Sequence, residues 1–205
     1  MHHENKIYLA SKSPRRRELL HQIGIEFDLL LLRDAAPRGP DVTEIVLPDE
    51  LPYDYVSRVT QEKAAMAWKV MQMRKMIARP ILAADTTVVI DQKILGKPAN
   101  RGEAMHMLNQ LAGKTHLVLT SLAVQHANGL ETVTQTSEVS FASLSNAQIE
   151  AYCQTTDPYD KAGAYGIQGA AARFISNING SYSGIMGLSL FETCNVLRQS
   201  GIFIP

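Results

Sequence analysis

The sequence predicts an α/β fold in which helices flank a mixed, twisted sheet, and two observations lead to this class. Apolar runs of strand length alternate with segments of helical apolar periodicity, an order that favours parallel strands joined by crossover helices. Two long runs, His116 to Gln125 and Glu131 to Phe141, are instead joined by the turn residues His126 to Gly129, which predicts an antiparallel hairpin. Parallel and antiparallel pairs in one chain make the predicted sheet mixed.

The first segment predicts a strand followed directly by a helix. Ile7 to Ala10 is a short apolar run typical of a buried strand. Ser13 is a favourable N-cap, Pro14 is a favourable first helical residue, and Gly24 follows the apolar stripe where a helix would end. The sequence therefore predicts a helix from Pro14 to about Ile23.

The second segment predicts a strand, a loop and a long helix. Phe27 to Leu32 is apolar, whereas Arg33 to Pro52 is acidic and contains four prolines, a composition that predicts a flexible loop or an insertion. Tyr53 to Ile77 carries apolar residues at helical spacing. The elements predicted after it are a strand from Ile81 to Ile90, a turn to Ile94 and Leu95, a helix from Asn100 to Leu111, the hairpin, a helix from Ser145 to Thr155, a glycine-rich loop from Asp157 to Gly169, a strand from Arg173 to Ile178 and a helix from Ser189 to Gln199.

Composition limits the class of protein. The chain has 205 residues, enough for one domain with a sizeable core. Lys plus Arg and Asp plus Glu each number 20, so no net charge would attract nucleic acid or an anionic membrane, and no apolar run is long enough to span one. Cys153 and Cys194 are too few and too far apart for a disulfide framework or a zinc site. Because no apolar signal segment opens the sequence, we expect a cytoplasmic protein.

Three arginines, Arg15 to Arg17, fall in the first turn of the first predicted helix. A helix N-terminus already carries roughly half a positive charge and unpaired N–H groups, so each cation there costs about 0.3 to 1 kcal/mol. A bound phosphate would remove the conflict, and a strand that breaks into a helix is a usual place for phosphate binding. The alternative is a solvated face with Glu18 as partial relief.

Asp85 lies within the otherwise apolar run from Ile81 to Ile90. An ionised carboxylate there is costly unless it is paired or bound to a metal. One interpretation is a structural salt bridge or turn. The other is a metal ligand or general base that faces phosphate, because Mg²⁺ is typically held by one or two carboxylates and by substrate phosphates. Lys97 lies near Asp85 if the intervening turn folds back as a hairpin, and is otherwise a solvated surface residue.

A third feature is the glycine-rich loop, where Gly163, Gly166 and Gly169 recur at every third position. Such a loop can approach a nucleobase closely, with Tyr165 stacking on the base and Gln168 hydrogen-bonded to its edge. The alternative is a surface turn with Tyr165 packed on the core. Composition alone does not separate these two interpretations.

Four motifs together resemble the Maf family of nucleoside triphosphate pyrophosphatases. They are Ala10-Ser-Lys-Ser-Pro-Arg-Arg16, Ala84-Asp-Thr86 with Lys97-Pro98, Lys161-Ala-Gly-Ala-Tyr-Gly-Ile-Gln-Gly169, and Ile178-Asn-Gly-Ser-Tyr182 with Gly187-Leu188. They follow in order through nearly the whole chain, so the set is far more specific than any one member.

The resemblance implies a fold similar to inosine triphosphate pyrophosphatase, with residues 1–205 forming a single domain of two lobes around a central cleft. It implies hydrolysis of a nucleotide between the α- and β-phosphates with a divalent metal cation, Mg²⁺ or Mn²⁺, in a house-cleaning or cell-division-linked role. The glycine-rich loop resembles the pyrimidine branch, which acts on dTTP and UTP. The implied partner is the nucleoside triphosphate; we expect neither nucleic acid nor a membrane, and a homodimer is left open.

Motif position implies the site residues. Asp85, Lys63, Lys97 and Arg16 carry over as catalytic residues, with Asp85 also as the metal ligand, and Lys63 is placed through Gln61-Glu-Lys-Ala64, which is similar to a helix of the family. The implied substrate-binding residues are Ser11, Arg15, Arg16, Thr86, Tyr165 and Gln168.

One position departs from the family pattern. The family usually carries an acidic pair shortly after the second strand, and ungapped counting places it at Ala35 and Ala36. Asp34, Asp41 and Glu44 lie nearby, and the sequence does not show which of them substitutes. Two other functions therefore stay open: a nucleotide-binding regulator without catalysis, and an interaction factor in septum formation.

Overall fold

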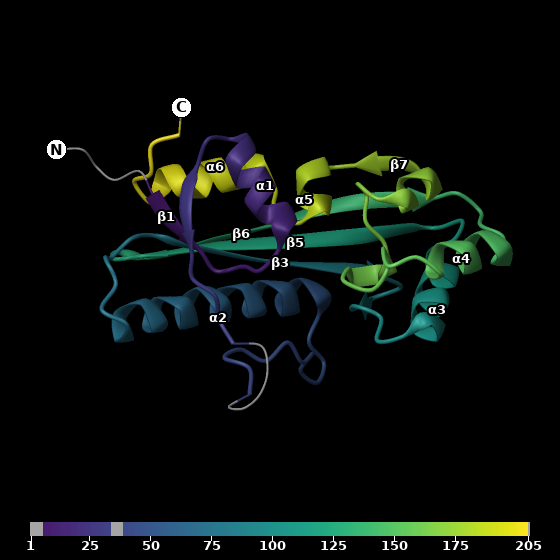
Figure 1. Ribbon diagram of the computed structural model, residues 1–205, viewed down its shortest axis with the longest axis horizontal. Coiled ribbons are helices and arrows are strands. Elements are labelled where there is room, and N and C mark those ends of the chain that lie inside the picture. The colour runs from purple at the N-terminus through teal and green to yellow at the C-terminus, as the bar shows by residue number, and fades with distance from the viewer. Residues whose placement is uncertain (1–5, 34–38, 205) are drawn as a thin grey trace.

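The computed structural model describes residues 6–33 and 39–204, and a seven-stranded sheet forms its centre (Figure 1). The strands are β1 (Lys6–Leu9), β2 (Glu26–Leu29), β3 (Ile81–Ile90), β4 (Lys93–Leu95), β5 (Thr115–His126), β6 (Gly129–Phe141) and β7 (Ile175–Asn179). Their order is β2-β1-β3-β5-β6-β7, and β4 pairs with β3. β1 pairs in parallel with β2 and β3, whereas the other pairs are antiparallel, so the predicted mixed sheet is confirmed.

Helices cover both faces of this sheet. α2 (Pro52–Met73) packs on one face, and α1 (Pro14–Gln22), α5 (Tyr182–Met186) and α6 (Leu190–Gln199) lie on the other (Figure 1). α3 (Arg101–Leu111) and α4 (Asn146–Cys153) gather at one end, near the 3₁₀ turns η1 (Ala162–Ala164) and η2 (Ala170–Phe174). Among the described helices, none is long and apolar enough to cross a membrane.

Successive side chains of β3 pack alternately into two hydrophobic clusters, one on each face of the sheet. Leu82 and Ala84 pack in the cluster that contains α1 and α6 residues, whereas Ala83 packs with Ala64 and Ala67 of α2. Because successive side chains of a strand point to opposite faces, the next two residues, Asp85 and Thr86, also emerge on opposite faces of the sheet.

Several element boundaries differ from the predicted ones. β2 spans Glu26–Leu29 and so ends three residues before the predicted end at Leu32. α2 ends at Met73 and not near Ile77, because Lys75 adopts a left-handed φ of 51° and the Met76 amide donates back to the Met71 carbonyl, a hydrogen bond that closes the helix end. β7 begins two residues later than predicted, after the η2 turn. The short helix α5 was not predicted, because it spans five residues and contains Gly184.

The described part of the predicted loop, residue 33 and residues 39–51, holds no helix or strand, and Pro52 already belongs to α2. The loop segment that leads into α2 lies on the side of this helix that faces away from the sheet (Figure 1). Ala35 and Ala36, the expected place of the acidic pair, and Asp34 lie outside the described residues.

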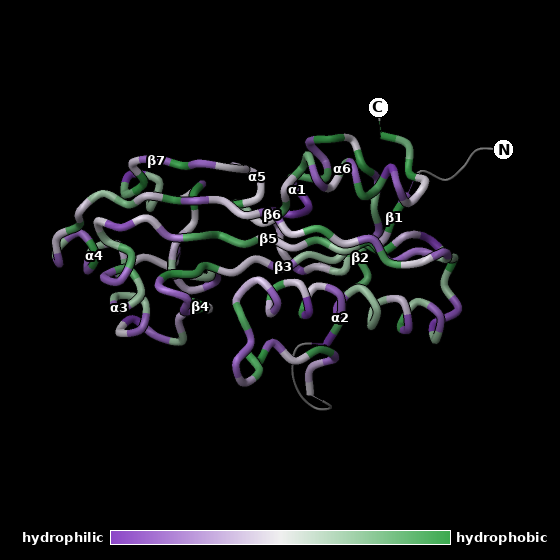
Figure 2. The backbone as a smooth tube through the Cα atoms, turned by 180° about the vertical axis from the view of Figure 1, so that it is seen from behind, coloured by the Kyte–Doolittle hydropathy of each residue, from purple (hydrophilic) through white to green (hydrophobic). Residues whose placement is uncertain are grey.

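β3 has a break along one of its edges. β1 pairs with β3 at Ile81 and Leu82 and then stops, and β4 pairs with β3 from Val88 onward. Figure 2 shows β1 and β4 in opposite halves of the molecule. Within the described strands, the residues from Ala83 to Thr87 therefore have a ladder partner only on the β5 side. We call this stretch of open strand edge the sheet gap.

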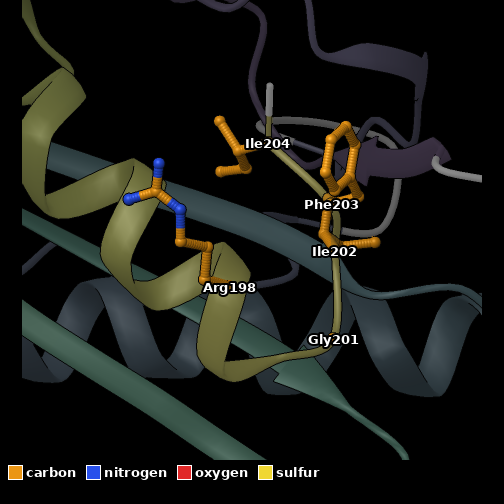
Figure 3. Close-up of a pocket in the computed structure, with 5 residues that line it drawn as sticks. All are labelled: Arg198, Gly201, Ile202, Phe203 and Ile204. Atoms are coloured by element: carbon orange, nitrogen blue, oxygen red, sulfur yellow. The ribbon is translucent and has the colours of Figure 1, made fainter.

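The C-terminal segment folds back beside α6. Ile202 and Ile204 are buried, whereas Phe203 is 70% exposed. Together with Arg198 and Gly201, these residues line a hollow of about 450 Å³ (Figure 3). No residue implied by the family motifs lines it, so the candidate site must be sought elsewhere.

Candidate active site at the sheet gap

The first half of the site forms around Arg16 at the start of α1. Ser13 caps this helix by accepting a hydrogen bond from the Arg16 amide, as its sequence predicts. The Arg16 side chain turns toward the sheet and donates from Nε to the Gly187 carbonyl (2.7 Å), from Nη1 to Ser11 Oγ (3.2 Å) and from Nη2 to Thr86 Oγ1 (3.3 Å). These contacts fix the plane of the guanidinium group. We call Ser11, Arg16, Thr86 and Gly187 the arginine half.

The guanidinium keeps donors for an anion. An arginine side chain has five N–H groups, and the three contacts above leave one N–H on each terminal nitrogen. Burial lowers the pKa of Arg16, and the nearby charge of Arg15 lowers it further, whereas the carboxylates of Asp85 and Glu44 raise it. A bound phosphate would offset the burial of this positive charge.

The second half of the site is a carboxylate cluster on the α2 face of the sheet. Lys63 Nζ lies 2.7 Å from Asp85 Oδ1 and 2.7 Å from Glu44 Oε1. Asp85 and Lys63 are largely buried, whereas Glu44 is half exposed. We call Glu44, Lys63 and Asp85 the carboxylate half. The ion pair that the buried position of Asp85 required is therefore present, and Lys63 supplies it.

Glu44 is held in place through its neighbours. Its carbonyl accepts a hydrogen bond from the Tyr55 hydroxyl (3.2 Å), and Arg58 Nη2 donates to the carbonyl of Ile45 (3.0 Å). Arg58 also donates to both carboxylate oxygens of Glu50, at 2.6 and 2.9 Å, and this contact lowers the pKa of Glu50 to about 2. These contacts from α2 thus fasten the loop at Glu44 and on its C-terminal side.

Asp41, the other acidic residue considered from the sequence, lies elsewhere. Its carboxylate accepts hydrogen bonds from the backbone amide (2.8 Å) and the Nε (2.9 Å) of Arg33. Of the two described candidates, only Glu44 lies beside Asp85, with which it shares Lys63.

The carboxylate half fits a divalent cation. Its two carboxylate oxygens already converge on one positively charged atom, the Lys63 Nζ. Oxygen ligands from one or two carboxylates, completed by water and substrate phosphate, are the set that Mg²⁺ takes in nucleotide sites. Among the described residues, no group of three or more His, Cys, Asp or Glu side chains is placed to hold a metal ion, so a cation here would have two protein carboxylates, Glu44 and Asp85, as ligands.

The two halves lie on opposite faces of the sheet and meet at the sheet gap. Asp85 and Thr86 are neighbours in β3, and both lie where β3 has no strand beside it. Burial lowers the pKa of Arg16, and the charges of Asp85 and Glu44 act on it in the opposite direction. A triphosphate lying across this open edge would therefore have arginine donors on one side and carboxylates on the other.

The remaining expected cations, Arg15 and Lys97, are both connected to the glycine-rich loop. Arg15 Nη1 pairs with Asp160 Oδ2 at 3.2 Å, which ties the start of α1 to the glycine-rich loop. Lys97 is exposed and follows β4, which folds back on β3 as predicted, with Leu95 opposite Val88. If this antiparallel register is continued beyond Leu95, it brings the Lys97 backbone toward Thr86. The Gly163 amide donates to the Gly96 carbonyl at 3.0 Å, so the Lys97 turn and the glycine-rich loop are joined.

Tyr165 and Gln168 of the glycine-rich loop differ in their surroundings. Tyr165 is 5% exposed, its hydroxyl bonds to His116 Nε2 at 2.8 Å, and its ring packs edge-on against Phe141 and His116. This is the core packing that the sequence left as the alternative, and stacking on a base would require the ring to leave it. The Gln168 side chain is exposed and belongs to the same loop as Asp160.

Sequence reasoning missed several contacts at the site. Thr120 of β5 bonds to Thr86, and Ser121 lies directly opposite Asp85, fully buried, with no hydrogen-bond partner for its hydroxyl among the described residues. The signal was available, since Thr120 and Ser121 are a polar pair inside an apolar strand, as Asp85 and Thr86 are. The sequence analysis identified Gly187 only as part of a motif. In the structure its backbone carbonyl accepts the hydrogen bond from Arg16 Nε.

The chain belongs to the Maf-like protein family, which it matches over residues 6–200. It is 51% identical over 201 residues to a dTTP/UTP pyrophosphatase of Nitrosospira multiformis, with 98% of this chain and 97% of that protein covered. It is 48% identical over 205 residues to a dTTP/UTP pyrophosphatase of Bordetella avium, with both chains covered in full. Among solved structures, the Staphylococcus aureus Ham1 protein matches with a TM-score of 0.40 and 10% identity over 67% of this chain and 72% of that one.

Proposed function

We propose that this protein hydrolyses dTTP and UTP to the nucleoside monophosphate and pyrophosphate. The observation that carries the proposal is the meeting of an oriented arginine and two carboxylates at one open strand edge. Proteins named dTTP/UTP pyrophosphatase, about half identical to this chain over nearly its whole length, support the choice of reaction and nucleotide.

The arginine half would bind the phosphates. Hydrolysis of a phosphoanhydride depends on positioning and on neutralising the charge of the phosphate oxygens. Arg16 offers one N–H from each terminal nitrogen, a fork that suits two phosphate oxygens. Arg15 and Lys97, both connected to the glycine-rich loop, add positive charge for the rest of the triphosphate.

The carboxylate half would hold a divalent cation, Mg²⁺ or Mn²⁺, through Asp85 and Glu44. When bound, such a cation polarises a phosphate oxygen and lowers the pKa of a coordinated water. Lys63 Nζ now occupies the position between the two carboxylates, so it would move toward the phosphates when a metal and substrate arrive. Asp85, which is the more buried carboxylate, would orient the attacking water.

The glycine-rich loop would read the base through the exposed amide of Gln168. An amide offers both a donor and an acceptor, which suits the pyrimidine edge of uracil or thymine. Within this proposal the protein is a single two-lobed domain that works in the cytoplasm in a house-cleaning role, and a homodimer stays an open alternative.

The reaction is tested by identifying the products. We expect dTTP to give dTMP and pyrophosphate in the presence of Mg²⁺ or Mn²⁺, as separated by anion-exchange chromatography. Release of dTDP and orthophosphate would contradict cleavage between the α- and β-phosphates. Tight dTTP binding without any product would instead favour a regulatory binding protein, and a melting temperature unchanged by nucleotide would favour an interaction factor.

The base assignment predicts a change in selectivity for Gln168→Glu. An ionised carboxylate can only accept hydrogen bonds, so it would face a base carbonyl without a donor, at a cost of about 1 to 3 kcal/mol. We expect kcat/KM for UTP and dTTP, relative to purine triphosphates, to fall by about tenfold. Gln154→Glu, an exposed change at the end of α4, is the matched control and should leave the ratio unchanged. An unaltered ratio in the Gln168 variant would remove this residue from base recognition.

A further inference from the structure

Arg16 is attached to a chain of two hydroxyl groups, those of Thr86 and Thr120, that runs along one face of the sheet. Arg16 Nη2 donates to Thr86 Oγ1 (3.3 Å), Thr86 Oγ1 and Thr120 Oγ1 lie 3.0 Å apart, and Thr120 Oγ1 donates to the Gly184 carbonyl (2.7 Å). Thr86 and Thr120 are opposite each other on neighbouring strands, on the face that carries α1 and α5. Thr120 is fully buried. The chain of contacts ends on α5, a helix that sequence patterns do not predict.

The hydrogen bonds of this chain can run in only one direction. A hydroxyl group has a single hydrogen to donate. Thr120 gives its hydrogen to the Gly184 carbonyl, so in its contact with Thr86 it must accept. Thr86 then gives its hydrogen to Thr120, which leaves its lone pairs directed at the Arg16 N–H. The orientation of the Thr86 hydroxyl, and with it the acceptor that holds Arg16 Nη2, is therefore set by Thr120.

We infer that Thr120 is a positioning residue for phosphate binding, acting on Arg16 through Thr86. The inference rests on the proposed function, since it assigns phosphate binding to Arg16. Without the Thr120 hydroxyl, the Thr86 hydroxyl would be free to rotate. Its hydrogen would then be free to point toward Arg16 Nη2, where a donor faces another donor and the hydrogen bond is lost. The guanidinium would keep its contacts with Ser11 and Gly187 but lose the fixed plane that directs its remaining N–H groups at the gap.

The test is Thr120→Val, which keeps the shape of the side chain and removes the hydroxyl group. We expect KM for dTTP, and the dissociation constant for a non-hydrolysable α,β-imido analogue of dTTP, to rise by about tenfold, equivalent to about 1.4 kcal/mol. The kcat should change by no more than about twofold, because Thr120 lies one residue further from the substrate than Thr86 does and touches neither carboxylate. Thr120→Ser retains the hydroxyl and should restore both values.

Thr193→Val is the matched control for stability. Thr193 of α6 is also fully buried, and its hydroxyl also donates to a carbonyl (2.7 Å), that of Ser189, the residue that precedes this helix. Melting temperatures of both valine variants should fall, but only the Thr120 variant should lose nucleotide affinity. Equal loss of affinity in both variants would show a general effect of stability and overturn the inference.

A double-mutant cycle with Thr86→Val completes the test. If Thr120 acts through Thr86, the losses of affinity caused by the two changes should fail to add, because the first break already frees Arg16. Additive losses, an unchanged affinity in Thr120→Val, or a failure of Thr120→Ser to restore it would each overturn the inference. Analogue binding by the wild-type protein tests the role of Thr120 separately from the proposed hydrolysis. If the protein binds the analogue but releases no pyrophosphate from dTTP, the proposed hydrolysis is wrong, and the effect of Thr120→Val on analogue affinity still tests the inference.

Discussion

Asp85→Asn should lower kcat/KM for dTTP by more than tenfold, which corresponds to at least about 1.4 kcal/mol of lost transition-state stabilisation. The amide keeps the shape of the carboxylate but loses its charge, so it can neither balance Lys63 nor serve as a good ligand for a divalent cation. Steady-state kinetics with Mg²⁺ and with Mn²⁺ measure the effect. Mn²⁺ affinity without nucleotide, measured by electron paramagnetic resonance, should fall in parallel.

Asp28→Asn is a matched control for this experiment. Asp28 also lies in a strand of the sheet and also pairs with cations, Lys6 and Arg79, each at 2.8 Å, but it belongs to the edge strand β2. Its replacement should leave kcat/KM unchanged. If Asp85→Asn likewise keeps wild-type activity and a normal melting temperature, then its ion pair with Lys63 is structural only.

The free energy of unfolding should decrease on acidification from about pH 6.5 to about pH 4, and His116 should be a principal cause. His116 is 2% exposed, and burial lowers its pKa from 6.5 to about 4. In this pH range the unfolded chain binds a proton at His116 and the folded chain does not, so unfolding is favoured as pH falls. A difference of this size in pKa corresponds to about 3 kcal/mol, fully present as stability above pH 6.5 and lost by pH 4.

Urea denaturation at a series of pH values measures this dependence. His116→Gln removes the titrating group and should flatten the curve between pH 6.5 and 4, although its stability at pH 7 falls because the contact with Tyr165 changes. His106→Gln, on the exposed side of α3, should retain the wild-type slope. An equally steep curve for the His116 variant would assign the acid sensitivity to other groups.

Most of the fold could be predicted because its signals are local. Ser13, Asn100 and Ser145 cap helices in the structure as their sequence context predicts, and the two long hairpin strands follow their apolar runs. The end of α2 could not be predicted in this way, because Lys75 takes up the left-handed turn that glycine usually provides. Helix α5 was missed for the complementary reason, since its position depends on tertiary contacts such as that between Thr120 and Gly184.

The site was predictable in its charges but not in its partners. A buried carboxylate in β3 required compensation, and Lys63 provides it, yet periodicity says nothing about Glu44, which lies in an irregular loop. The excess positive charge of Arg16 is balanced in part by the Gly187 carbonyl, 171 residues away in the chain. Contacts of that separation have no signature in a single sequence. For Tyr165 the sequence allowed two interpretations, stacking on a base or packing in the core. The burial of its ring supports packing in the core.

The sheet gap also bears on how this protein avoids association through its strands. An open strand edge offers unpaired N–H and C=O groups that another chain could extend, and proteins usually shield such edges with charge or keep them short. Here the open stretch from Ala83 to Thr87 is bounded by β1 at one end and β4 at the other, so a strand that docked alongside it could pair over about five residues at most. A small ligand faces no such obstacle. The same interruption therefore leaves a short strand edge open for recognition while limiting how far another strand could extend the sheet there.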